Sequence, residues 1–347
     1  MAKKVIDKAK LQEILARLGK LYRIYAPVRQ NGAVEFQEVE GRLDIVVDFH
    51  NCRISPKGFM LPQTEYLFTY TTAKDRQDAA ILHEVRQSGQ DRIIFAIRPC
   101  DARSFQLLDL NFQTADCVDP WWLERRDSTI LIGLACNTPC STCFCTSVGG
   151  GPFATEGLDV LLIDTGSTFV AQECSEKGKR VLQAAGIDTE APAEVIKQAD
   201  ELQKKAESSI SSTVPTDNLR EQDLKALFQA EFWEPIQFAC INCGVCTFLC
   251  PTCWCFDIQD EVRRERGVRL RLWDSCMFPL FTLHGSGHNP RAQKLQRVRQ
   301  RFMHKLKYFV DKYQTTVACV GCGRCVEYCP VNIDIRQVFQ LMNDYEA

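Results

Sequence analysis

Eight cysteines follow one spacing pattern that occurs twice, and this repeat constrains the fold more than any other feature of the chain. The two copies are Cys240-x2-Cys243-x2-Cys246-x3-Cys250-Pro251 and Cys319-x2-Cys322-x2-Cys325-x3-Cys329-Pro330. Three closely spaced thiolates on a curling loop can reach three corners of a four-iron cubane, and the fourth ligand must come from a distant segment. The repeat therefore predicts two 4Fe–4S clusters.

The two motifs are expected to exchange their last ligand. Their spacing is that of the bacterial two-cluster ferredoxins, in which the fourth cysteine of each motif binds the other cluster. The first cluster would then be held by Cys240, Cys243, Cys246 and Cys329. The second would be held by Cys319, Cys322, Cys325 and Cys250. A pair of zinc sites is the weaker alternative, because four-cysteine zinc sites usually consist of two CxxC halves.

Glycine and proline at matching places support the repeat. Gly244 and Gly323 fall between the second and third cysteines, where the loop must turn tightly. Pro251 and Pro330 are predicted to open the helix that follows each loop.

Five further cysteines lie between residues 100 and 145 and predict a third centre. RIIFAIRPCDARS places Cys100 just after a strand, and TILIGLACNTPCSTCFC places Cys136 just after another. If these strands are parallel neighbours, both thiols face one crevice beyond the carboxyl ends of the strands. We expect a third cluster there, with Cys140 as the substitute in a ligand set of Cys100, Cys136, Cys143 and Cys145. Structural thiols or a zinc site are the alternative.

Two neighbouring features of this segment carry their own expectations. Asp101 is placed to cap the helix after Cys100. The backbone amides of VGGGP, which follows the cysteine-rich segment, could face an anionic centre.

The remaining cysteines divide into two groups. Cys253, Cys255 and Cys276 lie between the two motifs, and three interpretations stay open for them: a further cluster, alternate ligation of the second cluster, or structural thiols. His284 and His288 are candidate fourth ligands, although their Gly-rich loop favours a role in a turn. Isolated cysteines usually behave as small buried hydrophobes, which is our interpretation of Cys52, Cys117 and Cys174.

The total of 19 cysteines is odd, and no continuous apolar stretch near the N-terminus predicts an export signal. We therefore expect metal thiolates in a reducing compartment, and a cytoplasmic location. A net charge of -2 argues against a nucleic-acid partner, and no apolar run is long enough for a membrane span.

The first half of the chain alternates between strand-like and helix-like segments, which favours a partly parallel sheet. The expected strands are EYLFTYT, RIIFAI, TILIGLA and DVLLIDT. Helices are expected in MAKKVIDKAKLQEILARLGKLY, AKDRQDAAILHEVRQSG, ECSEKGKRVLQAAG and the Ala/Glu/Lys-rich segment after it, and farther on in LREQDLKALFQAEF, DIQDEVRRER and RAQKLQRVRQRFMHKLKYFVDKY.

The predicted fold class is α+β: an α/β-like N-terminal domain with a partly parallel sheet, followed by a mostly helical two-cluster ferredoxin-like domain. We place the first domain at residues 1–210 and a linker with a connecting helix at 211–235. The ferredoxin-like domain follows at 236–347, with an insert at 251–318. That insert contains seven Lys or Arg residues between Arg291 and Lys307 and no acid. A solvated helix face is the plainer interpretation; a docking face, or compensation of anionic clusters, is the functional one.

No dinucleotide fingerprint, P-loop, nucleophile elbow or CxxCH haem site occurs in the sequence. We therefore expect a chain that carries electrons without catalytic residues of its own, as one subunit of a larger oxidoreductase.

The ordered segments RPCDARS, CPTCWCFDIQDE, LWDSCMF, GSGHNPR and CVGCGRCVEYCPVNID, together with the cysteine-rich segment at 136–145, resemble one protein family. That family is the iron–sulfur electron-transfer subunits, which include those of anaerobic sulfite reductase and the beta subunit of cytosolic NiFe (sulf)hydrogenases. The resemblance implies a hetero-oligomer that also contains a flavin/NAD(P)H-binding subunit, together with a catalytic oxidoreductase subunit of hydrogenase, sulfite reductase or heterodisulfide-reductase type. It also favours Cys136 over Cys140, which departs from the family pattern.

Two other functions remain as alternatives. One is a self-contained thiol or disulfide reductase that uses a cluster with Cys253, Cys255 and Cys276. The other is a redox sensor, against which the balanced charge and the lack of a DNA-binding motif argue.

Overall fold

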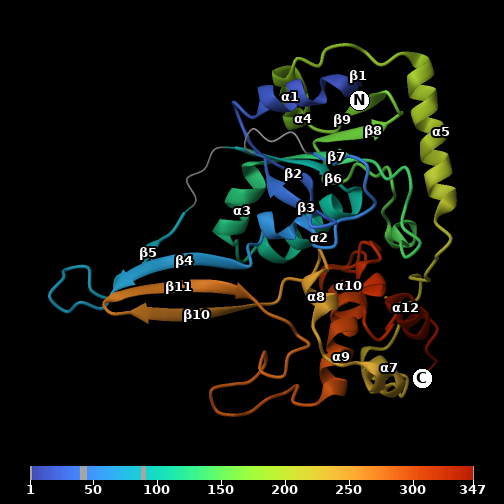
Figure 1. Ribbon diagram of the computed structural model, residues 1–347. Helices are drawn as coiled ribbons and strands as arrows, with labels where there is room; N and C mark the ends of the chain where they lie inside the picture. The colour runs from blue at the N-terminus through green and yellow to red at the C-terminus, as the bar shows by residue number, and fades with distance from the viewer. Residues whose placement is uncertain (1, 40–44, 87–90, 347) are drawn as a thin grey trace.

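The computed structural model describes residues 2–39, 45–86 and 91–346. Its first half forms a mixed sheet between helices, and most of its second half forms a helical bundle beneath that sheet (Figure 1). The predicted combination of a partly parallel sheet with helices is therefore confirmed. Within the described ranges, no helix is long and apolar enough to cross a membrane.

The larger sheet has antiparallel edges and a parallel centre. Its order is β1 (Lys3–Asp7), β9 (Thr168–Glu173), β8 (Val160–Asp164), β7 (Thr129–Leu134), β6 (Arg92–Ile97), β2 (Arg23–Gln30) and β3 (Ala33–Glu38). The β2–β6, β6–β7 and β7–β8 pairs are parallel. Helices cover both faces of these strands, which explains why β6 and β7 are apolar along almost their whole length.

Each face of the large sheet has its own core. One face packs against α1 (Leu11–Leu18) and α4 (Glu176–Ala185), whose C-terminus is Gly186 in the left-handed conformation (φ 73°). The other face packs against α2 (Pro99–Phe112), α3 (Pro120–Asp127) and α5 (Ala193–Ser209). The predicted strands are confirmed, and so are the helices now labelled α4 and α5.

A second, antiparallel sheet extends as an arm from the body of the molecule (Figure 1). Its order is β10 (Phe256–Arg263), β11 (Arg266–Trp273), β4 (Thr64–Thr71) and β5 (His83–Glu84). β11 pairs with β4, so the insert between the cysteine motifs completes a sheet begun almost two hundred residues earlier.

Three helix predictions are wrong in whole or part. DIQDEVRRER forms most of β10 and the turn to β11, where cross-strand pairing outweighs its local helical preference. AKDRQDAAILHEVRQSG, residues 73–89, forms turns and β5 up to residue 86, and its last three residues lie outside the described residues. The N-terminal helix is confined to α1, because the preceding KKVID pairs with β9 as strand β1.

The helices of the second half surround a separate core that contains Trp233, Phe302 and Phe339. They are α6 (Leu224–Gln229), α7 (Trp233–Ala239), α8 (Val245–Phe248), α9 (Lys294–Met303), α10 (Phe309–Tyr313), α11 (Arg324–Glu327) and α12 (Ile335–Asn343). A single π-helical segment, His304–Tyr308, joins α9 to α10. The helices predicted in residues 219–232 and 291–313 thus form, with later starts than predicted. The proposed domain boundaries stay a prediction.

Candidate metal centres

The two cysteine motifs have the same backbone conformation. Gly244 (φ 76°) and Gly323 (φ 77°) are left-handed and begin α8 and α11. In the equivalent positions two residues earlier, the N–H of Asn242 donates to Cys240 Sγ at 3.4 Å, and that of Gly321 donates to Cys319 Sγ at 3.5 Å. Because such bonds stabilise negative charge on sulfur, the repeated loop suits an anionic thiolate centre.

Each predicted ligand set is brought together in space. The set assigned to the second cluster lines a cavity of about 370 Å³: Cys250, Cys319, Cys322 and Cys325. In the set assigned to the first cluster, burial raises the pKa of Cys246, and Cys240, Cys243 and Cys329 are close enough to add to that shift. Within the described residues, no group of three or more His, Cys, Asp or Glu is arranged to hold a single metal ion. A cubane differs in needing its thiolates spread around four irons.

The prolines after the motifs do not open helices. Residues 251–252 and 330–331 form turns, and the next helix after Pro330, α12, starts only at Ile335 with Asp334 as its cap. That prediction was wrong because the chain must first turn away from the fourth cysteine of each motif.

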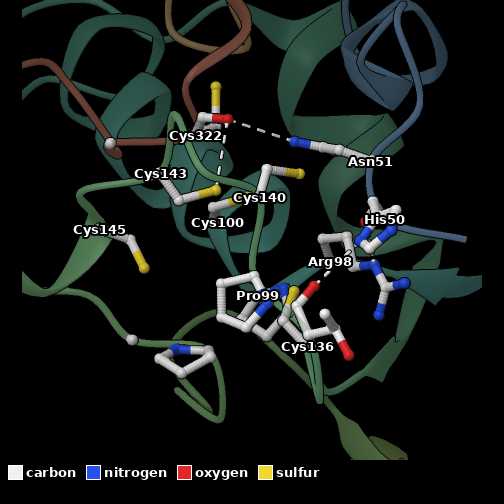
Figure 2. Close-up of a pocket in the computed structure, with 15 residues that line it drawn as sticks. His50, Asn51, Arg98, Pro99, Cys100, Cys136, Cys140, Cys143, Cys145 and Cys322 are labelled. Atoms are coloured by element: carbon white, nitrogen blue, oxygen red, sulfur yellow. Dashed lines mark hydrogen bonds between the residues drawn. The ribbon is translucent and has the colours of Figure 1, made fainter. Parts of the chain in front are cut away.

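The cysteines of the first half line a second cavity, of about 390 Å³, shown in Figure 2. β6 and β7 are parallel neighbours, as the interpretation of Cys100 and Cys136 requires. The five thiols around this cavity are Cys100, Cys136, Cys140, Cys143 and Cys145, and Cys322 of the second motif reaches the same cavity. Gly151, from the segment predicted to face an anionic centre, also lies in its wall.

Arg98 holds the mouth of this cavity together. Its buried guanidinium donates to the carbonyls of Leu134 (3.1 Å), Ala135 (2.7 Å) and His50 (2.8 Å), so it joins the ends of β6 and β7 to the loop before them. It also lowers the pKa of Cys136, although burial of that thiol raises the pKa by more. No pattern in the sequence indicates this role of Arg98.

Cys140 and Cys143 differ from their neighbours because their side chains interact directly. A hydrogen bond between them lowers the pKa of Cys140 to about 6 and raises that of Cys143. The cavity therefore offers five thiols to a centre that needs four, and the choice between Cys136 and Cys140 stays open in the geometry.

Asp101 has a different role from the predicted cap. The N-cap of α2 is Arg98, and the Asp101 carboxylate instead accepts two hydrogen bonds from Arg324, at 2.7 and 2.8 Å. Both side chains are 1% exposed. Arg324 also donates to the carbonyl of Cys52 at 2.8 Å. Since Arg324 lies inside the second motif, this buried ion pair fixes that motif to the first half of the chain.

The loop of the N-terminal cavity also packs directly on the second motif. Phe144 N–H donates to the Gly321 carbonyl at 2.9 Å, and Cys143 Sγ lies 3.8 Å from the Cys322 carbonyl oxygen (Figure 2). Gly321 is left-handed (φ 64°), and a Cβ on it would lie 2.6 Å from the Cys145 backbone. The two cysteine-lined cavities are therefore adjacent.

The basic run of the insert is not a solvated face. Arg297, Arg301, Lys305 and Lys307 are buried, and the plainer of our two interpretations was wrong. The thiols of Cys246 and Cys325 raise the pKa of Arg301, and those of Cys250 and Cys253 raise the pKa of Lys305, in both cases against burial, which lowers it. These cations therefore favour negative charge on the surrounding sulfurs.

Cys253, Cys255 and Cys276 line a third cavity, together with Arg301, His304 and Lys305. Cys276 is buried, whereas the reductase alternative needs accessible thiols here. His284 and His288 lie on an exposed loop, and a backbone bond between them (2.9 Å) supports the predicted turn. Of the isolated cysteines, Cys52 is buried as predicted, Cys174 is half-buried, and Cys117 is exposed, so that prediction was wrong for Cys117.

The chain matches known proteins in two comparisons. Residues 239–333 match the family model of a 4Fe-4S dicluster domain. The chain is also 30% identical over 324 residues to the sulfhydrogenase 2 subunit beta of Pyrococcus furiosus, which covers 93% of this chain and 92% of the relative. This chain therefore belongs to the family of sulfhydrogenase beta subunits. No solved structure matches it.

Membership in this family of sulfhydrogenase beta subunits, together with the dicluster domain, makes the chain an iron–sulfur electron-transfer subunit. The resemblance stated from the cysteine segments is confirmed at that level. The match to the dicluster domain spans both copies of the repeated motif, Cys240–Pro251 and Cys319–Pro330.

Proposed function

We propose that this protein relays electrons between a flavin/NAD(P)H-binding partner and the catalytic subunit of a multi-subunit oxidoreductase, through three 4Fe–4S clusters. The observation that carries the proposal is the contact between the two cysteine-lined cavities. Cys143 Sγ lies 3.8 Å from the Cys322 carbonyl, and the thiols of both halves thereby form one continuous series.

The ligands we assign are those of the sequence prediction. Cys240, Cys243, Cys246 and Cys329 hold the first cluster; Cys319, Cys322, Cys325 and Cys250 the second; and Cys100, Cys136, Cys143 and Cys145 the third. The shared wall of the two cavities supports this arrangement, because short gaps between centres suit electron transfer. When bound, the clusters supply one-electron redox chemistry.

The residues of the chain stabilise and shield that chemistry. The N–H groups of Asn242 and Gly321 donate to thiolate sulfur, which disperses its negative charge. Arg301 and Lys305 add positive charge next to Cys246, Cys250 and Cys325. Both effects lower the cost of adding an electron to an already anionic centre.

The test is reduction by the partner. The protein is purified anaerobically with its flavin partner, NAD(P)H is added, and frozen samples are followed by electron paramagnetic resonance (EPR). We expect signals of reduced 4Fe–4S clusters to appear at the rate of flavin reoxidation, and not in the isolated chain. Intact clusters that stay oxidised while the flavin is reduced would contradict the proposal.

A further inference from the structure

The cavity around Cys253, Cys255 and Cys276 is not used by the proposed relay. It has a volume of about 310 Å³, against about 370 and 390 Å³ for the cavities assigned to the second and third clusters. Its lining includes two side chains besides the cysteines that carry charge, Arg301 and Lys305, and one imidazole, that of His304. In size and in thiol content it is therefore comparable to the other two.

The charges around this cavity are unbalanced. Arg301 and Lys305 are 5% and 6% exposed, and neither forms an ion pair with a carboxylate anywhere in the described ranges of the chain. Arg301 Nε is buried and has no hydrogen-bond partner among the described atoms. Because a buried charge without a counter-charge costs several kcal/mol, roughly 3–5 when a partner is missing, this wall fits an anionic occupant.

A third cation approaches from the first half of the chain. Lys57, which is buried, donates to the carbonyls of Cys250 (3.0 Å) and Cys253 (2.8 Å) and lies 4.1 Å from the centre of the Trp273 ring. It fixes the backbone that presents Cys253 and adds positive charge from an element other than the one that carries Arg301 and Lys305. This third positive charge again points to an anionic centre.

Rigid elements hold the three thiols. The N–H of Asp274 donates to the Cys255 carbonyl at 2.9 Å, so the residues at the base of the β10–β11 hairpin are joined. Cys255 precedes β10, and Cys276 follows β11. Their side chains interact with each other, and that of Cys253 interacts with Cys250. Preorganised thiols at the end of a paired hairpin are suited to binding a metal cluster.

We propose that Cys253, Cys255 and Cys276 ligate a fourth 4Fe–4S cluster and that the His304 imidazole completes its coordination. His304 is chosen because Thr252, Trp254, Ala318 and the two cations offer no comparable ligand in this wall. Its ring lies edge-on to Trp254, with centroids 5.0 Å apart. The contact between Cys250 and Cys253 would place this cluster next to the second one.

Metal analysis of the full-length protein tests the proposal. Iron and acid-labile sulfide are measured per chain in the wild type and in the triple variant Cys253→Ser/Cys255→Ser/Cys276→Ser, with exposed Cys117→Ser as the control. We expect the triple variant to lose about four irons and four sulfides, the content of one cubane, and the control to lose none. Equal iron in the triple variant and the wild type overturns the proposal, and so does replacement of the iron by about one zinc per chain.

A second measurement needs no folded cysteine variant. In reduced wild-type protein labelled with ¹⁵N-histidine, electron–nuclear double resonance should show a directly bound nitrogen, and His304→Ala should abolish that coupling. No nitrogen coupling in the wild type overturns the assignment of His304. A wild-type count of about twelve irons, unchanged in the triple variant, rejects the fourth cluster but leaves the three-cluster relay standing; about eight contradicts both.

Discussion

Arg324 shows how a single residue connects the two halves of the chain. Its guanidinium is buried against Asp101 at 2.7 Å and also donates to the Cys52 carbonyl at 2.8 Å. Nothing in the spacing of the cysteines predicts this pair, because its partners are more than two hundred residues apart. The cysteines themselves could be predicted, since their chemistry depends on residue type and local spacing. The cations that surround them could not, and the burial of Arg301 was predicted wrongly for the same reason.

Replacing Arg324 by Met should destabilise the protein by about 3–5 kcal/mol, because it leaves the Asp101 carboxylate buried without its partner. The measurement is the temperature at which cluster absorbance and far-ultraviolet circular dichroism are lost. Arg269→Met is the control, since its pair with Asp260 is largely exposed and should be worth less than about 1 kcal/mol. Equal thermal midpoints for the two variants would contradict this role of Arg324.

The choice between Cys136 and Cys140 is also a question about single residues. We expect Cys136→Ser to lose about four irons, the content of one cubane, and Cys140→Ser to retain the wild-type content. Iron and sulfide analysis of both variants decides it. The reverse result would assign Cys140 as the ligand, and its low pKa, about 6, would then reflect that role.

Elements defined by buried apolar residues were predicted well. β6, β7 and β8 have short apolar sequences between turns, and α4 has a clear N-cap serine and C-terminal glycine. β10 was predicted as a helix because most of its side chains are exposed and no apolar alternation marks it. Its conformation depends on pairing with β11, which in turn pairs with β4, and such distant pairing leaves no local pattern.

The loop at Gly321 should be sensitive to a single methyl group. Gly321→Ala adds a Cβ 2.6 Å from the Cys145 backbone in a left-handed conformation, so the loop must move away from the N-terminal cavity. We expect loss of iron from the third site and a lower thermal midpoint.

The matched control is Gly32→Ala, which has a similar positive φ (81°) and nothing within 4 Å of the added atom. It should cost only the backbone strain, about 1–2 kcal/mol, and keep all of the iron. A full iron content in Gly321→Ala would show that this close approach is not needed for the third site.

At the scale of the whole molecule, the arm and the body are joined by a buried charge network. Glu65 of β4 pairs with Arg271 of β11 and Arg125 of α3, and Arg271 also reaches Asp119 at 2.5 Å. The insert of the second half is thereby fixed to the first half at a place remote from the cysteines.

Glu65→Gln should destabilise this junction by about 3–5 kcal/mol, because two buried arginines lose a shared counter-charge. Faster proteolysis within the β10–β11 hairpin, with iron content retained, is the expected readout. Glu84→Gln, which removes an exposed pair with Arg86, is the control and should change little. Unchanged proteolysis of Glu65→Gln would contradict a structural role for the network.

The central claim is that a cluster in the first half of the chain lies next to those of the dicluster domain. The most direct test is the iron and acid-labile sulfide content of Cys100→Ser/Cys145→Ser compared with the wild type and with Cys117→Ser. The account predicts a loss of about four irons and four sulfides in the double variant only, with the remaining clusters still reducible. An unchanged iron content in the double variant would contradict it, because the relay would then end within the dicluster domain.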